Sequence, residues 1–146
     1  NTDGITIYYE QETGTDQVDA GGVVTAIAAN VLSGDFDITQ KRGSQGKFLG
    51  APDLRGDGEY IMKIRRFLPD FITQTGDTKI TLMLRNYPNS SAASSSLGPF
   101  TITSSTDKVD TRARARAIAL KIENTSSSQN WKLGTFRLDI QPDGRR

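Results

Sequence analysis

The chain has 146 residues, of which 35% are hydrophobic and 24% charged, and its formal net charge is +1. This length suits one domain that buries about two thirds of the surface its unfolded form exposes. The absence of cysteine and histidine removes disulfides, thiolate metal sites, the cysteine nucleophile and the commonest general base. The composition therefore disfavours most hydrolases and metalloenzymes, and we expect neither enzymatic activity nor a cofactor.

The modest net charge hides a polarised distribution along the chain. Residues 1–40 contain seven acidic residues and no lysine or arginine, so the remainder carries the positive charge. Such poles suit self-association or a charged partner, although they can also neutralise each other within the fold. No apolar run approaches the length of a membrane span, so we expect no membrane insertion. Because the sequence begins at Asn1 without methionine, we expect a C-terminal piece of a longer protein, with residues 1–30 as an N-terminal extension.

The first half of the chain shows short strand patterns separated by polar turns. Residues 5–10 alternate and are rich in β-branched and aromatic side chains, which is typical of a strand. Residues 23–32 fit a strand or a short helix, and their valines and glycines favour a strand. A further short strand is predicted at residues 35–38. The polar, glycine-rich residues 40–58 form a longer connection than usual, as functional loops often do.

The middle of the chain predicts two longer strands. Residues 60–71 are apolar at both parities with basic residues interspersed, and Pro69 ends the pattern, which indicates an edge or interface strand. Residues 79–85 give a clear core strand, with Ile80, Leu82 and Leu84 on its buried face. A loop tip at residues 89–96 precedes a strand at 100–103.

Residues 111–123 carry an alternation of alanine and arginine that continues into an apolar half. A strand is favoured over a helix, because a helix would spread the apolar side chains around its axis. One face of this single strand would present Arg112, Arg114, Arg116, Ile118, Leu120 and Ile122. The closing run, with Phe136, Leu138 and Ile140 on one face, is expected to pair antiparallel with it across a turn at 126–130.

Together these patterns predict a single all-β domain over residues 1–146. Seven or eight short strands separated by glycine, serine, asparagine and aspartate turns are typical of an antiparallel β-sandwich or a barrel-like module. The predicted core comprises Ile80, Leu82, Leu84, Ile118, Leu120, Ile122, Phe136, Leu138 and Ile140.

The arginine row is the principal candidate site. Arg112, Arg114 and Arg116 would stand about 6.6 Å apart on one strand face, since a strand rises about 3.3 Å per residue. Such a row can bind carboxylates of a neighbouring strand or subunit, and the acidic first forty residues are candidate donors of those carboxylates. Contact with DNA phosphates is the alternative, although no aromatic side chains are interleaved for stacking.

Other motifs are better explained by ordinary surface structure. Residues 53–59 are acidic and glycine-rich like a calcium loop, and they include the tripeptide Arg55-Gly56-Asp57 of integrin ligands, but a solvated turn suffices. The glycosylation sequons at Asn89 and Asn124 are expected in turns. Carboxylate pairs such as Asp35 and Asp37 fit a solvated acidic face better than acid–base chemistry.

Several segments in order resemble the C-terminal end of the large tail nozzle, or tail tubular (stabilisation), proteins of short-tailed bacteriophages. The resemblance covers roughly residues 31–146 and rests on Ser33-Gly34-Asp35-Phe36-Asp37-Ile38, Arg65-Arg66-Phe67-Leu68-Pro69-Asp70-Phe71, Gly98-Pro99-Phe100-Thr101-Ile102, Lys108-Val109-Asp110-Thr111-Arg112-Ala113-Arg114, Trp131-Lys132-Leu133-Gly134 and residues 137–146. It implies a β-rich virion component of the tail that assembles as a ring, usually a hexamer, beside other tail or portal proteins. Viral DNA would then be retained by this ring and pass through it on ejection.

Two other classes of function remain open. A carbohydrate- or receptor-binding β-sandwich would use Trp131, Tyr60 and Tyr87 with the 40–58 loop as its contact surface. A glycosidase that relies on acidic residues is the other class.

Overall fold

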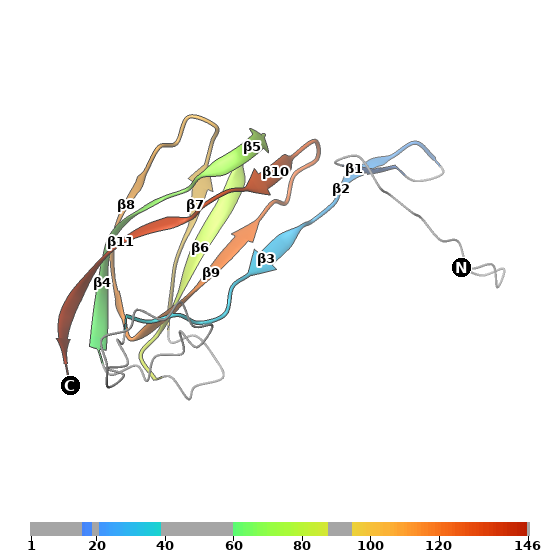
Figure 1. Ribbon diagram of the computed structural model, residues 1–146. Helices are drawn as coiled ribbons and strands as arrows, with labels where there is room; N and C mark the ends of the chain where they lie inside the picture. Colours follow the sequence, from blue (N-terminus) through green and yellow to red (C-terminus); the bar gives the residue numbers. More distant parts are fainter. Residues whose placement is uncertain (1–15, 19–20, 39–59, 88–94, 146) are drawn as a thin grey trace, which may run out of the picture.

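A computed structural model describes residues 16–18, 21–38, 60–87 and 95–145 (Figure 1). These residues form eleven strands and no helix, and every pairing between strands is antiparallel, so the predicted all-β antiparallel fold is confirmed. The number of strands is larger than the seven or eight expected, because the structure includes several short strands of only three to five residues. They are β1 Asp16–Val18, β2 Val24–Ala26, β3 Asn30–Leu32, β4 Tyr60–Leu68, β5 Phe71–Thr75, β6 Thr78–Arg85, β7 Ser95–Ile102, β8 Val109–Ala115, β9 Ala117–Glu123, β10 Asn130–Leu133 and β11 Arg137–Arg145. None of the described segments is a helix long and apolar enough to cross a membrane.

Two sheets form the body of the molecule. One has the strand order β3-β9-β6-β7 and the other the order β11-β4-β8. The short pair β5 and β10 extends beyond β4 and β11, while the pair β1 and β2 projects away from the body (Figure 1). The described residues 16–18 and 21–38 thus form an N-terminal arm that joins the body along β3.

The hydrophobic core lies between the two sheets. Phe67 of β4 is fully buried, and its ring centroid lies 5.5 Å from that of Phe100 on β7 and 5.4 Å from that of Phe136. Of the residues predicted for the core, six are buried and three are half-buried against the same cluster. The buried six are Ile80, Leu82, Leu84, Ile118, Leu120 and Ile122, and the half-buried three are Phe136, Leu138 and Ile140.

The expectation of one continuous strand through residues 111–123 is wrong. The chain bends at Arg116, so that β8 belongs to the three-stranded sheet and β9 to the four-stranded sheet. Ala113 and Ala115 face the core before the bend, whereas Ile118, Leu120 and Ile122 face the core afterwards. The inward parity therefore changes from odd to even, because a straight strand could not join two packed layers.

The expected partner of the closing strand is also wrong. β11 pairs with β4, where Leu138 lies opposite Phe67, and it does not pair with β8 or β9. β4 is consequently the central strand of its sheet and not an edge strand, although Pro69 does follow its end. Near Pro69, the Gly134 amide donates a hydrogen bond to the Asp70 carbonyl at 2.7 Å. This bond lies where the pair β4 and β11 meets the pair β5 and β10.

Residues 23–32 fitted either a strand or a short helix by sequence, and the structure shows two short strands there, β2 and β3. β3 pairs with β9, with Val31 opposite Ile122, and Phe36 forms an isolated bridge with Ile118 where a strand was predicted at 35–38. The Ser33 hydroxyl accepts a hydrogen bond from the Leu120 amide at 2.8 Å. The strand predicted at 5–10, the 40–58 loop and most of the 89–96 loop tip lie outside the described residues.

Candidate functional site

The three predicted arginines do not form one row. Arg112 and Arg114 lie on the solvent side of β8 and are exposed, as the buried Ala113 between them requires. Arg116 lies in the bend between β8 and β9, is half-buried, and donates its backbone amide to the Arg85 carbonyl at 3.0 Å. Only two of the three arginines therefore share a surface.

These two arginines belong to a larger charged surface on the outer side of the three-stranded sheet. We define the charged face as Lys63, Arg65 and Arg66 of β4, Asp110, Arg112 and Arg114 of β8, and Arg137, Asp139 and Asp143 of β11. It contains six basic and three acidic residues. The surface thus has an excess of positive charge, although the whole chain is nearly neutral.

Ion pairs between neighbouring strands organise the centre of the charged face. Arg66 lies in register with Asp110 on one side and Asp139 on the other. Its Nε lies 3.8 Å from the Asp110 carboxylate and 3.4 Å from that of Asp139. Opposite charges at directly facing positions stabilise a sheet by about 0.2–1 kcal/mol per pair.

Two further arginines have carboxylate partners. Arg114 forms an ion pair with Asp143 across the width of β4, and Arg137 lies 3.6 Å from Asp70 at the end of the sheet. For Arg114 and Arg137 the carboxylates come from Asp143 and Asp70 and not from the first forty residues, whose role as a donor to a neighbouring subunit stays a prediction. In the arm, Asp35 instead pairs with Arg85 at 2.7 Å.

Three cations of the charged face form no ion pair with a described residue: Lys63, Arg65 and Arg112. Lys63 also lies directly opposite Arg114 in the strand register. Like charges at facing positions destabilise a sheet. An external anionic group at this place would relieve that repulsion.

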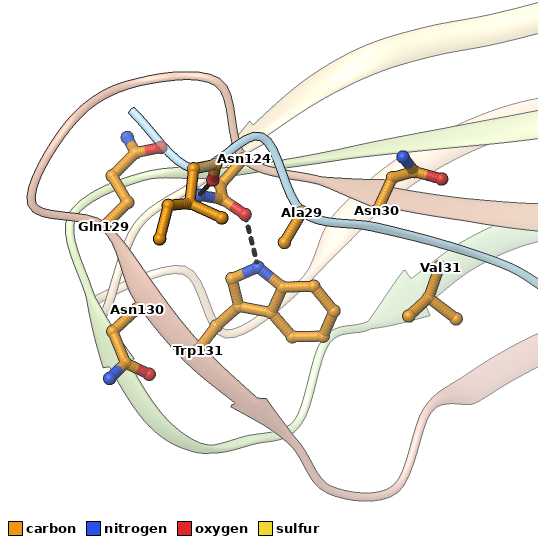
Figure 2. A pocket seen from close by; sticks show the side chains of 8 residues that line it. Ala29, Asn30, Val31, Asn124, Gln129, Asn130 and Trp131 are labelled. Atoms are coloured by element: carbon orange, nitrogen blue, oxygen red, sulfur yellow. Dashed lines mark hydrogen bonds between the residues drawn. The ribbon is translucent and has the colours of Figure 1, made fainter. Parts of the chain in front are cut away.

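A second candidate site is an open pocket of about 330 Å³ beside Trp131, on the side of the molecule where the arm joins the body (Figure 2). The pocket lies between the arm and the turn from β9 to β10. Its lining residues are uncharged: Ile27, Ala29, Asn30, Val31, Asn124, Gln129, Asn130 and Trp131.

Asn124 fixes the geometry of this pocket. It is 4% exposed, and its Oδ1 accepts a hydrogen bond from the Trp131 Nε1 at 3.1 Å, drawn as the dashed line between the two labelled side chains in Figure 2. Its Nδ2 donates to the Ile27 carbonyl at 3.2 Å, and its backbone amide donates to the Ala29 carbonyl at 3.0 Å. This sequon begins the connection between β9 and β10, as its expected place in a turn requires, and the Asn124 side chain is buried and hydrogen-bonded. No sequence pattern marked Asn124 as an anchor.

The aromatic residues predicted for a sugar-contacting surface do not come together. Trp131 is on β10, whereas Tyr60 begins β4 opposite Arg145, at the other end of the sandwich (Figure 1). Tyr87 follows β6 and is 73% exposed. Trp131 therefore remains as the one predicted aromatic residue that lines the pocket.

The remaining sequence motifs give no site in the described residues. The calcium-like stretch at 53–59 with its Arg55-Gly56-Asp57 tripeptide, and the sequon at Asn89, lie outside them. No group of three or more acidic residues that could hold a metal ion occurs within the described ranges. Asp35, considered with Asp37 for acid–base chemistry, is engaged by Arg85.

In comparisons with known proteins, no protein-family model matches the chain and no curated protein has a matching sequence.

Proposed function

We propose that this chain is a non-enzymatic structural module of a bacteriophage virion, in the tail tube or nozzle that closes the tail and retains the packaged DNA. The proposal rests on the resemblance of residues 31–146 to such proteins. In this role the module packs against copies of itself in a ring, which the resemblance implies to be a hexamer, beside other tail or portal proteins. Viral DNA passes through the ring on ejection.

The observation that best supports a packing role is the charged face. The inner side of the same sheet packs in the hydrophobic core, and the charged face on its outer side carries cations without carboxylate partners among the described residues. Arginine favours bidentate contacts with carboxylates, so Lys63, Arg65 and Arg112 suit an acidic surface on a neighbouring subunit. The acidic N-terminal region provides such charge in each copy.

Charge reversal on this face tests the proposal. The double variant Lys63→Glu/Arg112→Glu is expected to weaken self-association at least about tenfold, because each like-charge contact across an interface costs several kcal/mol. Multi-angle light scattering over a concentration series measures the particle mass against the 15.9 kDa of one chain, and negative-stain microscopy shows whether rings form.

The matched control is Lys132→Glu, which makes the same charge change at an exposed position on β10, away from the charged face. This control is expected to assemble like the wild type. A wild-type chain that stays monomeric at all concentrations, or a double variant that assembles normally, would contradict the packing role. Loss of salt-dependent binding to duplex DNA with unchanged assembly would instead assign the face to DNA.

A further inference from the structure

We propose that the pocket beside Trp131 is a binding site for a neutral saccharide. This site is separate from the charged face and does not depend on the proposed assembly. It differs from the aromatic surface predicted from the sequence, because Tyr60 and Tyr87 lie elsewhere and the arm supplies one wall.

The size of the pocket fits a small ligand. Its volume of about 330 Å³ is at the lower end of the range of about 300–1,000 Å³ that is usual for ligand pockets. The pocket is open to solvent, so it can hold one or two sugar rings while the other units of a longer saccharide extend into solvent. A large cofactor would exceed it.

The chemistry of the lining selects the class of ligand. No lining residue is charged, so the pocket offers no counter-ion to a phosphate, a carboxylate or a cation. Asn30, Gln129 and Asn130 line the pocket and carry primary amides, which can both donate and accept hydrogen bonds. Hydroxyl groups have the same dual capacity. The Gln129 Oε1 already accepts a hydrogen bond from the Ser126 amide at 3.2 Å. A purely apolar ligand would form no hydrogen bond with these amides.

The apolar part of the pocket matches the C–H face of a sugar ring. The half-buried Trp131 ring lies beside Ala29 with Val31 to one side (Figure 2), which gives a flat aromatic surface with small aliphatic neighbours. The C–H face of a pyranose can pack on such a surface while its hydroxyl groups reach the amides.

The site is also pre-organised. The Trp131 ring is held by the hydrogen bond to Asn124 and by an edge-to-face contact with Phe71, whose centroid lies 6.2 Å away. The same Asn124 fastens the arm at Ile27 and Ala29, so both walls of the pocket are fixed before any ligand arrives. A ligand then loses little affinity to the ordering of side chains.

Tryptophan fluorescence provides a direct test, because Trp131 is the single tryptophan of the chain. The probes are glucose, galactose, mannose, N-acetylglucosamine, maltose and lactose, each titrated to millimolar concentration. We expect at least one of them to give a saturable change in emission. Glucose 6-phosphate serves as the charged comparison and should bind no more tightly than glucose.

Two substitutions on the arm locate the binding. Val31→Arg places a long side chain at the pocket wall and should weaken binding at least tenfold. Val31 is 49% exposed, so the fold should tolerate the change. Val24→Arg is the matched control, because Val24 is 55% exposed on the same arm and does not line the pocket. It should bind like the wild type.

Saturation-transfer NMR with the same sugars repeats the measurement without relying on fluorescence. The proposal would be overturned by no response to any of the six neutral sugars with either method, by equal binding of Val31→Arg and wild type, or by tighter binding of glucose 6-phosphate than of glucose. Equal loss of binding in the two arginine variants would also overturn it, because it would remove the assignment to this pocket.

Discussion

Gly134 occupies a position where the backbone leaves no room for a side chain. A Cβ atom at Gly134 would lie 2.7 Å from the Asp70 carbonyl oxygen, the same atom that accepts the Gly134 amide hydrogen bond. This contact joins the paired strands β5 and β10 to β4 and β11. Small size, and not freedom of the backbone angles, is what this glycine provides.

Gly134→Ala is therefore expected to lower the free energy of unfolding by about 1–3 kcal/mol, as overpacking of a tight site does. Urea unfolding measures the change. Gly34→Ala is the matched control, since a Cβ at Gly34 meets nothing within 4 Å, and it should shift stability by less than about 0.5 kcal/mol. Equal unfolding midpoints for the two variants would contradict the steric argument.

The ion pairs of single arginines also explain why their partners were hard to predict from the pattern of charges in the sequence. Arg66 contacts two aspartates that lie far apart in sequence, and Arg114 reaches Asp143 across an intervening strand. Alternation placed Arg112 and Arg114 on one strand face, and the structure exposes that face to solvent. It could not identify partners that only the strand order brings near.

At the scale of elements, the N-terminal arm is attached to the body by a small number of polar contacts. β3 has three residues, and its neighbouring segment is fastened to the body by Asn124 and Ser33. Five of the large hydrophobic side chains on this arm are exposed: Val23, Val24, Ile27, Val31 and Leu32. Hydrophobic burial therefore contributes less to holding the arm than it does to holding the sheets.

Asn124→Ala should loosen the arm. The variant leaves the Ile27 carbonyl and the Trp131 indole N–H without their partner, at a cost of about 1–3 kcal/mol. We expect lower stability in urea, red-shifted tryptophan emission and faster hydrogen exchange in β3. Asn130→Ala, an exposed change on the adjacent strand, should leave all three measurements near wild type. Unchanged exchange in β3 in the first variant would show that Asn124 does not hold the arm.

The bend at Arg116 is the element-scale feature that periodicity missed. Alternation before and after the bend is regular, so the sequence looked like one strand. Two packed sheets need the chain to cross between them, and the crossing changes which parity faces inward.

Across the whole molecule, stability depends on contacts between the two sheets. Phe67 is at the centre of these contacts, since it is fully buried and packs on Phe100 of the opposite sheet and on Phe136. These partners are separated from it by dozens of residues along the chain. The body is therefore expected to unfold as one cooperative unit.

Phe67→Ala is expected to cost about 3–5 kcal/mol, because it removes a buried aromatic ring and leaves a cavity between the sheets. Calorimetry should show a single transition at a lower temperature. Tyr87→Ala removes an aromatic ring that is 73% exposed and should change stability by less than about 0.5 kcal/mol. Two separate transitions in Phe67→Ala would show that the sheets fold independently.

The sequence by itself determined the features that depend on neighbours along the chain. Period-two patterns identified the strands of the core, the inward side chains Ile80, Leu82 and Leu84, and the shared strand face of Arg112 and Arg114. Glycine and proline marked where several strands end. These features are local, because side-chain alternation and turn preferences act over a few residues.

Only the tertiary structure decided which strands meet. It placed β11 against β4, divided the arginine strand at Arg116, paired the cations of the charged face, and brought Asn124 and the arm around Trp131. Backbone hydrogen-bonding groups are much alike from one strand to the next, so pairing is selected by the burial of whole faces between distant segments. That selection is a property of the packed sandwich, and no short stretch of sequence contains it.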